Sequence, residues 1–146
     1  MSTKGRPEGE SAPKRVSAED SPVSTILIVE DNEKNMKLAR DVLQARGYAT
    51  LEATTGEDGV RLAREQLPDL VLMDIQLPGI NGIEALRRLR ADPATAAIPV
   101  LAVTASVMEQ DRRQIMQAGF DAYVGKPINL KEFLEAVRVA LEGGRA

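Results

Sequence analysis

From Val23 onward, the hydrophobic positions of the chain follow two alternating patterns. Short and nearly continuous apolar runs, of which TILIV at 25–29 is the first, are typical of strands in a parallel sheet covered on both faces. Between them, apolar residues recur every three or four positions, which predicts amphipathic helices. The expected strands are 25–29, 48–53, 69–73, 98–103 and 120–124, and the expected helices are 33–46, 55–67, one from Asn81, 106–118 and 129–142.

Capping residues and glycines support these helix limits. A polar residue followed three positions later by an acid is the pattern of a helix start. It occurs as Thr55 with Asp58, Asn81 with Glu84, and Asn129 with Glu132. Gly47 and Gly119 follow two other expected helices, where glycine readily ends a helix.

The elements differ in how apolar they are. The residues expected to face inward on the last helix are Leu130, Phe133, Leu134, Val137 and Leu141. The apolar stripe of helix 106–118 is thin by comparison, and strand 48–53, the least apolar, is expected at an edge of the sheet. Five strand–helix units in series predict an α/β domain: one parallel sheet with right-handed crossovers and helices on both faces.

Residues 1–22 differ in composition from the rest of the chain. They hold mainly Ser, Pro, Gly and charged residues, and Val16 is their only large aliphatic residue after Met1. Such a segment buries too little apolar surface to offset the entropy of ordering it. We expect a disordered tail over 1–22, with a docking or phosphorylation segment as the alternative. A single domain is expected over 23–146.

Composition narrows the chemistry and the partners. The formal charge of −3 argues against nucleic acid or an acidic membrane surface as the main partner. The chain has no cysteine and no histidine, so a bound metal should be a hard cation held by oxygen. The longest apolar run, 96–103, is too short to span a membrane, and the charged N-terminus is no secretory signal. We expect a soluble, cytoplasmic protein.

Chemically useful side chains follow the expected strands. Glu30 and Asp31 follow the first strand, Asp74 the third and Thr104 the fourth, and Lys126 comes two residues after the fifth. Ligands of open parallel sheets bind at this edge, so these side chains should converge. Each has an ordinary structural explanation, such as a helix cap, a satisfied hydroxyl or a solvated charge. Their occurrence together at successive strand ends favours a functional site.

Charge balance indicates what such a site would bind. Two carboxylates 4 Å apart repel by about 4 kcal/mol at an effective dielectric of 20. Lys126 compensates part of the charge of Glu30, Asp31 and Asp74, and a divalent cation would compensate the rest. With oxygen donors alone, that cation should be Mg²⁺, or Mn²⁺ as a substitute. The pattern favours a metal-assisted phosphoryl acceptor in which one carboxylate is the nucleophile.

The chain from about Ser24 to Leu141 resembles a response-regulator receiver domain, the flavodoxin-like module of two-component signalling. The matching segments are VEDN at 29–32, LVLMDIQLPGING at 70–82, VTA at 103–105, AGFDAY at 118–123 and KPI at 126–128. The resemblance implies a doubly wound sheet with strand order 2-1-3-4-5. The phrases VEDNEKNMKL, MDIQLPG and VTASVM are similar to single-domain regulators of the bacterial cell-division type and to receivers of hybrid kinases.

The resemblance also implies roles for the residues at the strand ends. Asp74 would be the phosphoacceptor, receiving the group from a sensor histidine kinase or a histidine phosphotransfer protein. Asp31, Asp74 and the backbone carbonyl of Gln76 would ligate Mg²⁺, and Glu30 would act through a metal-bound water. Lys126 would pair with a phosphoryl oxygen, and its bond to Pro127 is expected to be cis.

A switch is implied as well. Thr104 would move to bond the phosphoryl group, beside the small Ala105, and Tyr123 would rotate into the space that Thr104 vacates. The face formed by helix 106–118, strand 120–124 and helix 129–142 would then meet a downstream protein. Gln76 and Ser106 occupy the two positions that tune phosphoryl lifetime in this family.

Three other classes fit less well. A haloacid-dehalogenase-type phosphatase needs a second Asp two residues after the first, where this chain has Gln76. A flavodoxin would have a Ser/Thr-rich loop after the first strand, whereas this chain has the acidic 31–34. A pseudo-receiver normally lacks the acids or the lysine. We expect a single-domain response regulator without a DNA-binding output domain. We expect no enzymatic activity beyond its own phosphorylation and dephosphorylation.

Overall fold

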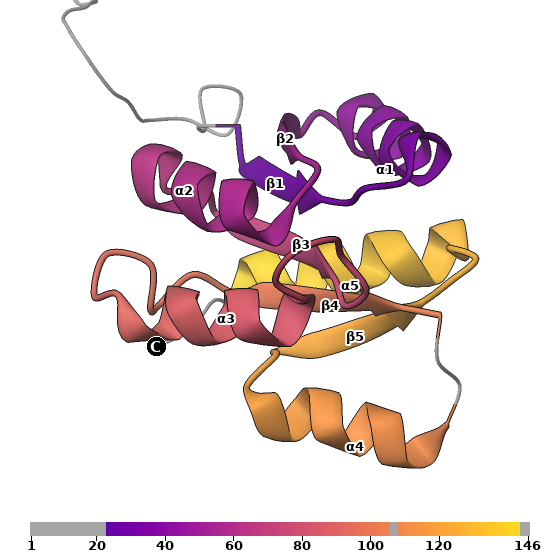
Figure 1. Cartoon of the computed structure of the whole chain (residues 1–146). Coiled ribbons are helices and arrows are strands. Elements are labelled where there is room, and N and C mark those ends of the chain that lie inside the picture. Colours follow the sequence, from indigo (N-terminus) through magenta and orange to yellow (C-terminus); the bar gives the residue numbers. More distant parts are fainter. Residues whose placement is uncertain (1–22, 106–107, 144–146) are drawn as a thin grey trace, which may run out of the picture.

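The computed structural model describes residues 23–105 and 108–143, which form one parallel sheet flanked by helices (Figure 1). Its strands, in the order β2-β1-β3-β4-β5, are β1 Thr25–Val29, β2 Ala49–Ala53, β3 Leu70–Asp74, β4 Val100–Thr104 and β5 Ala122–Gly125. Its helices are α1 Glu33–Ala45, α2 Gly56–Gln66, α3 Gly82–Ala91, α4 Glu109–Ala118 and α5 Leu130–Gly143. All strand pairs are parallel, so the expected doubly wound, flavodoxin-like fold is confirmed.

Strand composition follows position in the sheet. Every residue of the central strands β3 and β4 is buried, as their continuous apolar sequences predict. In β2 only Ala53 is buried, and this strand lies at an edge of the sheet, as expected. The sheet therefore has its most apolar strands in the middle.

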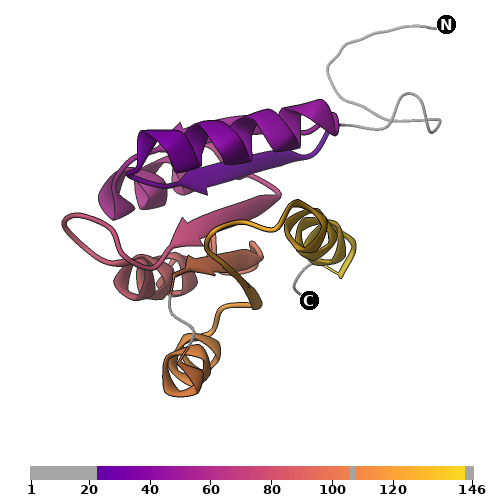
Figure 2. The same ribbon diagram turned by 90° about the vertical axis from the view of Figure 1, so that its right-hand side faces the viewer.

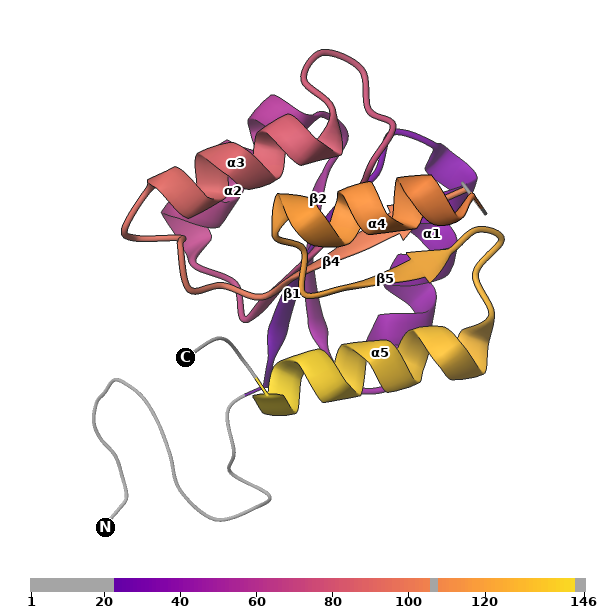
Figure 3. The same ribbon diagram turned by 90° about the horizontal axis from the view of Figure 1, so that it is seen from below.

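Two separate cores lie on the two faces of the sheet. One face is covered by α2, α3 and α4, and the other by α1 and α5 (Figures 1 and 2). The first core includes Leu86 and Phe120, and the second includes Leu43 and Phe133. Figure 3 shows that α4 and α5 lie on either side of the edge strand β5.

The three predicted capping residues all cap helices. The side chains of Thr55, Asn81 and Asn129 each accept a hydrogen bond from the backbone N–H three residues later, at 3.0, 2.9 and 3.0 Å. Gly119 has a positive φ and ends α4, and Gly47 also has a positive φ, directly after Arg46, the C-terminal cap of α1.

Two expectations about the last helices need correction. Leu130 was expected to face inward, but it is 49% exposed. It is the first residue of α5, and the buried residues of this helix, Phe133 and Val137, begin about one turn later. Helix α4 begins at Glu109, later than the predicted residue 106, and its N-cap Met108 makes no side-chain capping bond. Residues 106 and 107 lie outside the described residues.

The prediction of a disordered tail concerns residues 1–22, which also lie outside the described part of the chain. Within residues 23–105 and 108–143, no helix is both long enough and apolar enough to cross a membrane.

Candidate functional site

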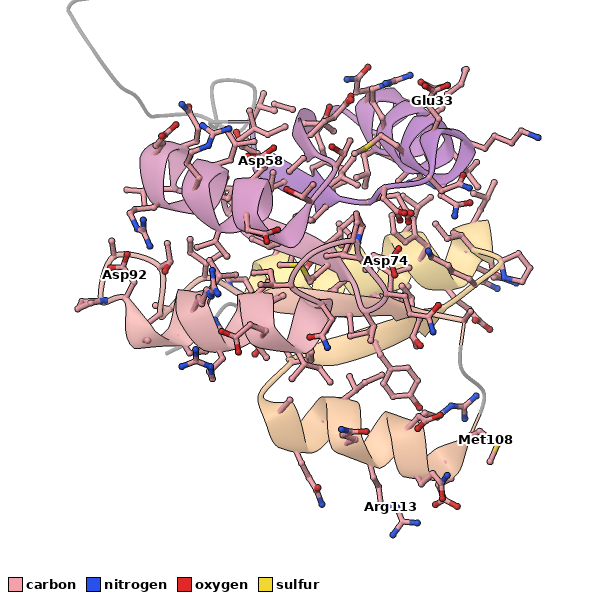
Figure 4. The ribbon with its side chains drawn as sticks, in the orientation of Figure 1. Glu33, Asp58, Asp74, Asp92, Met108 and Arg113 are labelled. Carbon is pink, nitrogen blue, oxygen red and sulfur yellow. The ribbon has the colours of Figure 1, made fainter. Side chains whose placement is uncertain are left out.

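The carboxyl ends of β1, β3, β4 and β5 bring the predicted side chains to one edge of the sheet. Glu30 directly follows β1, Asp74 and Thr104 end β3 and β4, and Lys126 directly follows β5. The strands are paired in register there, with Val29 beside Met73 and Asp74 beside Val103. Figure 4 shows Asp74 beside the loop that follows β3. The doubly wound topology therefore assembles residues that are far apart in the sequence.

Three carboxylates form a cluster at this edge. One oxygen from each of Glu30, Asp31 and Asp74 lies within 4.8 Å of the others. Glu30 and Asp74 are only 5% and 4% exposed, whereas Asp31 is exposed. Carboxylate oxygens so arranged are ligands for a hard divalent cation, so the residues present fit a Mg²⁺ site.

Lys126 connects the two buried carboxylates. Its Nζ donates to Asp74 Oδ2 at 2.9 Å and lies 3.0 Å from Glu30 Oε1. Burial raises the pKa of Glu30 above its usual value, and hydrogen bonds from the Asn32 amide and Lys126 oppose this rise. Burial lowers the pKa of Lys126, but its hydrogen bonds to Asp74 and Glu30 outweigh burial and raise that pKa overall. The lysine is therefore held as an ammonium.

Backbone amides position the same two carboxylates. Asn32 N–H donates to Glu30 Oε2 at 3.0 Å, and Gln76 N–H donates to Asp74 Oδ1 at 3.0 Å. Each carboxylate therefore has one oxygen on an amide and the other on Lys126. Such double anchoring fixes the rotamers of Glu30 and Asp74.

The loop after β3 is held close to the strand by a glycine. A Cβ on Gly82 would collide with the Asp74 carbonyl oxygen and would lie 2.9 Å from Ile75 Cα. Gly82 N–H donates to the Ile75 carbonyl at 2.9 Å. The absence of a side chain at Gly82 thus lets α3 begin directly against the backbone of Asp74.

The loop after β5 brings Lys126 to the site. Its backbone N–H donates to the Thr104 carbonyl at 2.8 Å, which continues the pairing of β4 and β5 by one residue. The Lys126–Pro127 peptide bond is cis, as expected.

Thr104 and Tyr123 belong to adjacent strands and to the same face of the sheet. Tyr123 pairs with Ala102, and Thr104 lies two residues further along β4, so both side chains project to the side covered by α4. Thr104 is 5% exposed, and Tyr123 is half-buried. The two side chains are diagonal neighbours.

Two contacts near the site were missed by sequence reasoning. The guanidinium carbon of Arg112 in α4 lies 5.6 Å from the centre of the Tyr123 ring. The carboxylate of Glu57 in α2 accepts a hydrogen bond from Ile80 N–H at 3.3 Å, in the loop after β3. In the sequence both residues look like ordinary charged residues on a helix surface. No spacing in the sequence indicates which residues they contact.

Comparison with known proteins gives one family. The family model described as the response regulator receiver domain matches residues 26–138. The polar-differentiation response regulator DivK of Brucella ovis is 47% identical over 114 residues, which cover 78% of this chain and 93% of that protein. DivK of Brucella abortus (strain 2308) gives the same identity and coverage.

Solved structures agree with this comparison. The receiver domain of a sensor histidine kinase from Pseudomonas aeruginosa PAO1 has a magnesium ion coordinated in its active site cleft. It is 32% identical, with a TM-score of 0.77, over 83% of this chain and 99% of that one. A CheY-like receiver domain protein from Methanospirillum hungatei JF-1 is 28% identical, with a TM-score of 0.75, over 84% of this chain and 96% of that one.

Proposed function

Because the chain belongs to the response regulator receiver domain family, we propose that it accepts a phosphoryl group on Asp74 and thereby changes its protein partners. The observation that carries this proposal is the anchored Asp74, whose two oxygens are held by Lys126 and by the Gln76 amide. Its similarity to DivK, at 47% identity, supports a single-domain regulator of the cell-division type.

The proposed reaction is an exchange of one bond to phosphorus. A carboxylate oxygen of Asp74 forms a bond to the phosphorus of a phosphohistidine, on a kinase or a histidine phosphotransfer protein. The bond between phosphorus and the histidine nitrogen breaks, and its electron pair stays on that nitrogen. The reaction needs positioning and charge neutralisation, and it needs no general base on this chain. That requirement fits a chain without histidine.

The acidic cluster would hold the cation. Asp31, Asp74 and the carbonyl of Gln76 would bind Mg²⁺, and Glu30 would act through a water molecule on it. When bound, Mg²⁺ would neutralise charge that develops on the phosphoryl oxygens. Lys126 supplies the positive charge of the protein itself, 2.9 Å from Asp74 Oδ2.

The new charge on Asp74 would be read through Thr104 and Tyr123. Both project to the face covered by α4, so a shift of the Thr104 hydroxyl toward the phosphoryl group would open space for the Tyr123 ring. The surface made by α4, β5 and α5 would change with it and would be the docking face for a downstream target. We place this function in the cytoplasm, without catalysis of any reaction other than its own phosphorylation and dephosphorylation.

The experiment uses beryllofluoride, which stands in for the phosphoryl group, and acetyl phosphate as a small donor. With Mg²⁺, wild type should show a changed amide NMR spectrum with beryllofluoride and should gain one phosphoryl group from acetyl phosphate. Asp74→Asn should show neither response, because it lacks the nucleophilic carboxylate oxygen.

The matched control is Asp58→Asn, which removes an exposed carboxylate from the first turn of α2 and should respond as wild type does. Equal responses of wild type and Asp74→Asn would overturn the assignment of Asp74.

A further inference from the structure

Helix α4 is attached to β5 through an arginine–tyrosine contact. The Arg112 guanidinium carbon lies 5.6 Å from the centre of the Tyr123 ring, within the range of a cation–π interaction. Of the residues of α4, all of which the structure describes, Ile115 alone is buried. The contact between Arg112 and Tyr123 therefore adds to the few core contacts of α4, which are those of Ile115 and Ala118.

One nitrogen of the Arg112 guanidinium lacks a hydrogen bond. This nitrogen, Nε, is buried and has no hydrogen-bond partner among the described residues. A buried donor without a partner destabilises the arrangement, whereas stacking on the ring stabilises it. The two effects oppose each other, so the contact between Arg112 and Tyr123 is weaker than it would be with a partnered Nε.

The ring that Arg112 holds lies between α4 and the active-site threonine. Tyr123 is the diagonal neighbour of Thr104 on the same face of the sheet. On its α4 side, a groove of about 580 Å³ is lined by Arg112, Met116 and Tyr123 among others. Toward β4, the residue paired with Tyr123 is Ala102, whose side chain is small. A ring that rotates toward Thr104 leaves Arg112 and changes the shape of this groove.

We propose that Arg112 restrains the switch: its contact with Tyr123 favours the unphosphorylated conformation and so sets how much activating signal the protein requires. The proposal rests on the proposed function of Asp74, Thr104 and Tyr123. A cation–π contact of ordinary strength corresponds to a shift of about two- to fivefold in a two-state equilibrium. Loss of the Arg112 side chain shifts the equilibrium toward the switched state by that factor.

The test follows the Tyr123 ring directly. The chain contains two tyrosines and no tryptophan, so incorporated 3-fluorotyrosine gives two ¹⁹F NMR signals. Tyr48 packs against the core on the opposite face and serves as the internal reference. Beryllofluoride is titrated in the presence of Mg²⁺, and the midpoint of the Tyr123 signal is measured. Arg112→Gln is expected to reach its midpoint at a concentration about two- to fivefold lower than wild type.

Arg113→Gln is the matched control, because it removes the same charge from the next residue. Arg113 is exposed, and Figure 4 shows its side chain pointing away from the sheet. Its midpoint should equal that of wild type. Arg112→Lys keeps the charge without the planar guanidinium and should fall between wild type and Arg112→Gln, which separates lost stacking from a loosened helix.

If the beryllofluoride midpoint of Arg112→Gln equals or exceeds that of Arg113→Gln, Arg112 does not restrain the switch, and the proposed function of Asp74 is unaffected. A lower midpoint for Arg112→Gln together with an intermediate midpoint for Arg112→Lys is the result that supports the restraint. A wild type that does not respond to beryllofluoride at all would overturn the proposed function itself, and the restraint with it.

Discussion

Lys126 lies between two buried carboxylates and places a positive charge beside both of them. Its Nζ is 2.9 Å from Asp74 Oδ2 and 3.0 Å from Glu30 Oε1, and its side chain is 19% exposed. The main effect of such a buried ion pair on stability is that Lys126 compensates the charge of the carboxylates. A buried charge without compensation is strongly destabilising.

Replacement of Lys126 by Met should therefore lower the free energy of unfolding by about 1–3 kcal/mol in EDTA at neutral pH. Mg²⁺ should stabilise this variant more than it stabilises wild type, because the cation replaces the missing positive charge. Urea unfolding followed by circular dichroism, with and without Mg²⁺, measures both effects. Lys131→Met, which removes an exposed charge from α5, is the control. Equal effects in the two variants would contradict the bridging role of Lys126.

Glu30 should make the stability depend on pH. Its pKa is raised above the usual value of 4.5, and burial is the largest cause. The folded chain therefore binds this proton more tightly than the unfolded chain does. The stability that Glu30 contributes is complete below pH 4.5 and is lost as the pH rises through the raised pKa. The unfolding free energy of wild type minus that of Glu30→Gln should therefore fall across that interval.

Urea unfolding without metal, from below pH 4.5 to neutrality, measures that difference. Glu33→Gln, which removes an exposed carboxylate from the first turn of α1, is the control for a change in charge alone. A difference that stays constant or grows as the pH rises would show that burial of Glu30 does not govern its proton.

At the scale of single residues, the sequence predicts which side chains meet but not how they bond. Glu30 and Lys126 each follow a strand and Asp74 ends one, and the parallel topology alone brings strand ends together. The bridge made by Lys126 and the contact of Arg112 with Tyr123 depend on side-chain rotamers, which the hydrophobic pattern of the sequence does not indicate.

Among the elements, the start of α3 is the one most closely fitted to the site. The backbone of Asp74 and Ile75 occupies the space where a side chain at Gly82 would lie. A methyl group there must push α3 or the end of β3 aside, and that displacement moves the carboxylate of Asp74.

Gly82→Ala is expected to destabilise the protein by about 1–3 kcal/mol, the usual range for an overpacked site. It should also slow phosphorylation by acetyl phosphate, because Asp74 is displaced. Gly143→Ala is the matched control, since a Cβ there meets nothing within 4 Å and alanine favours the helix. Thermal unfolding and mass spectrometry of the phosphorylated protein measure the two effects. Equal stability and equal phosphorylation of the two variants would contradict the close fit at Gly82.

Helix starts were predictable where a polar residue caps the helix. Asn81 and Asn129 cap α3 and α5 through their side chains, as their spacing to a following acid indicates. The start of α4 was not predictable in this way, because its N-cap is Met108, whose side chain makes no capping bond. Leu130 is a residue whose burial the spacing predicted wrongly. Its spacing fits the apolar stripe of α5, but it lies at the start of the helix and is exposed. Periodicity does not indicate where along a helix the core begins.

On the scale of the whole molecule, the two cores and the site are largely separate. The cores consist mainly of aliphatic side chains on the two faces of the sheet, and the charged residues lie at one edge of it. The sequence predicted this division well, because strand and helix periodicity indicates the apolar cores and the strand ends indicate where the polar side chains of the site lie. Mg²⁺ should therefore be needed for the chemistry of the protein, whereas the fold should form without it.

Removal of metal by EDTA should abolish phosphorylation of Asp74 and leave the fold intact. The far-ultraviolet circular dichroism spectrum should not change, because neither core contains a metal-binding side chain. Mg²⁺ added at ten times its dissociation constant should raise the unfolding free energy by about 1.4 kcal/mol. Asp31→Asn should require more Mg²⁺ for the same gain, since it removes one carboxylate of the cluster. Loss of secondary structure in EDTA, or undiminished phosphorylation by acetyl phosphate, would contradict this separation of fold and site.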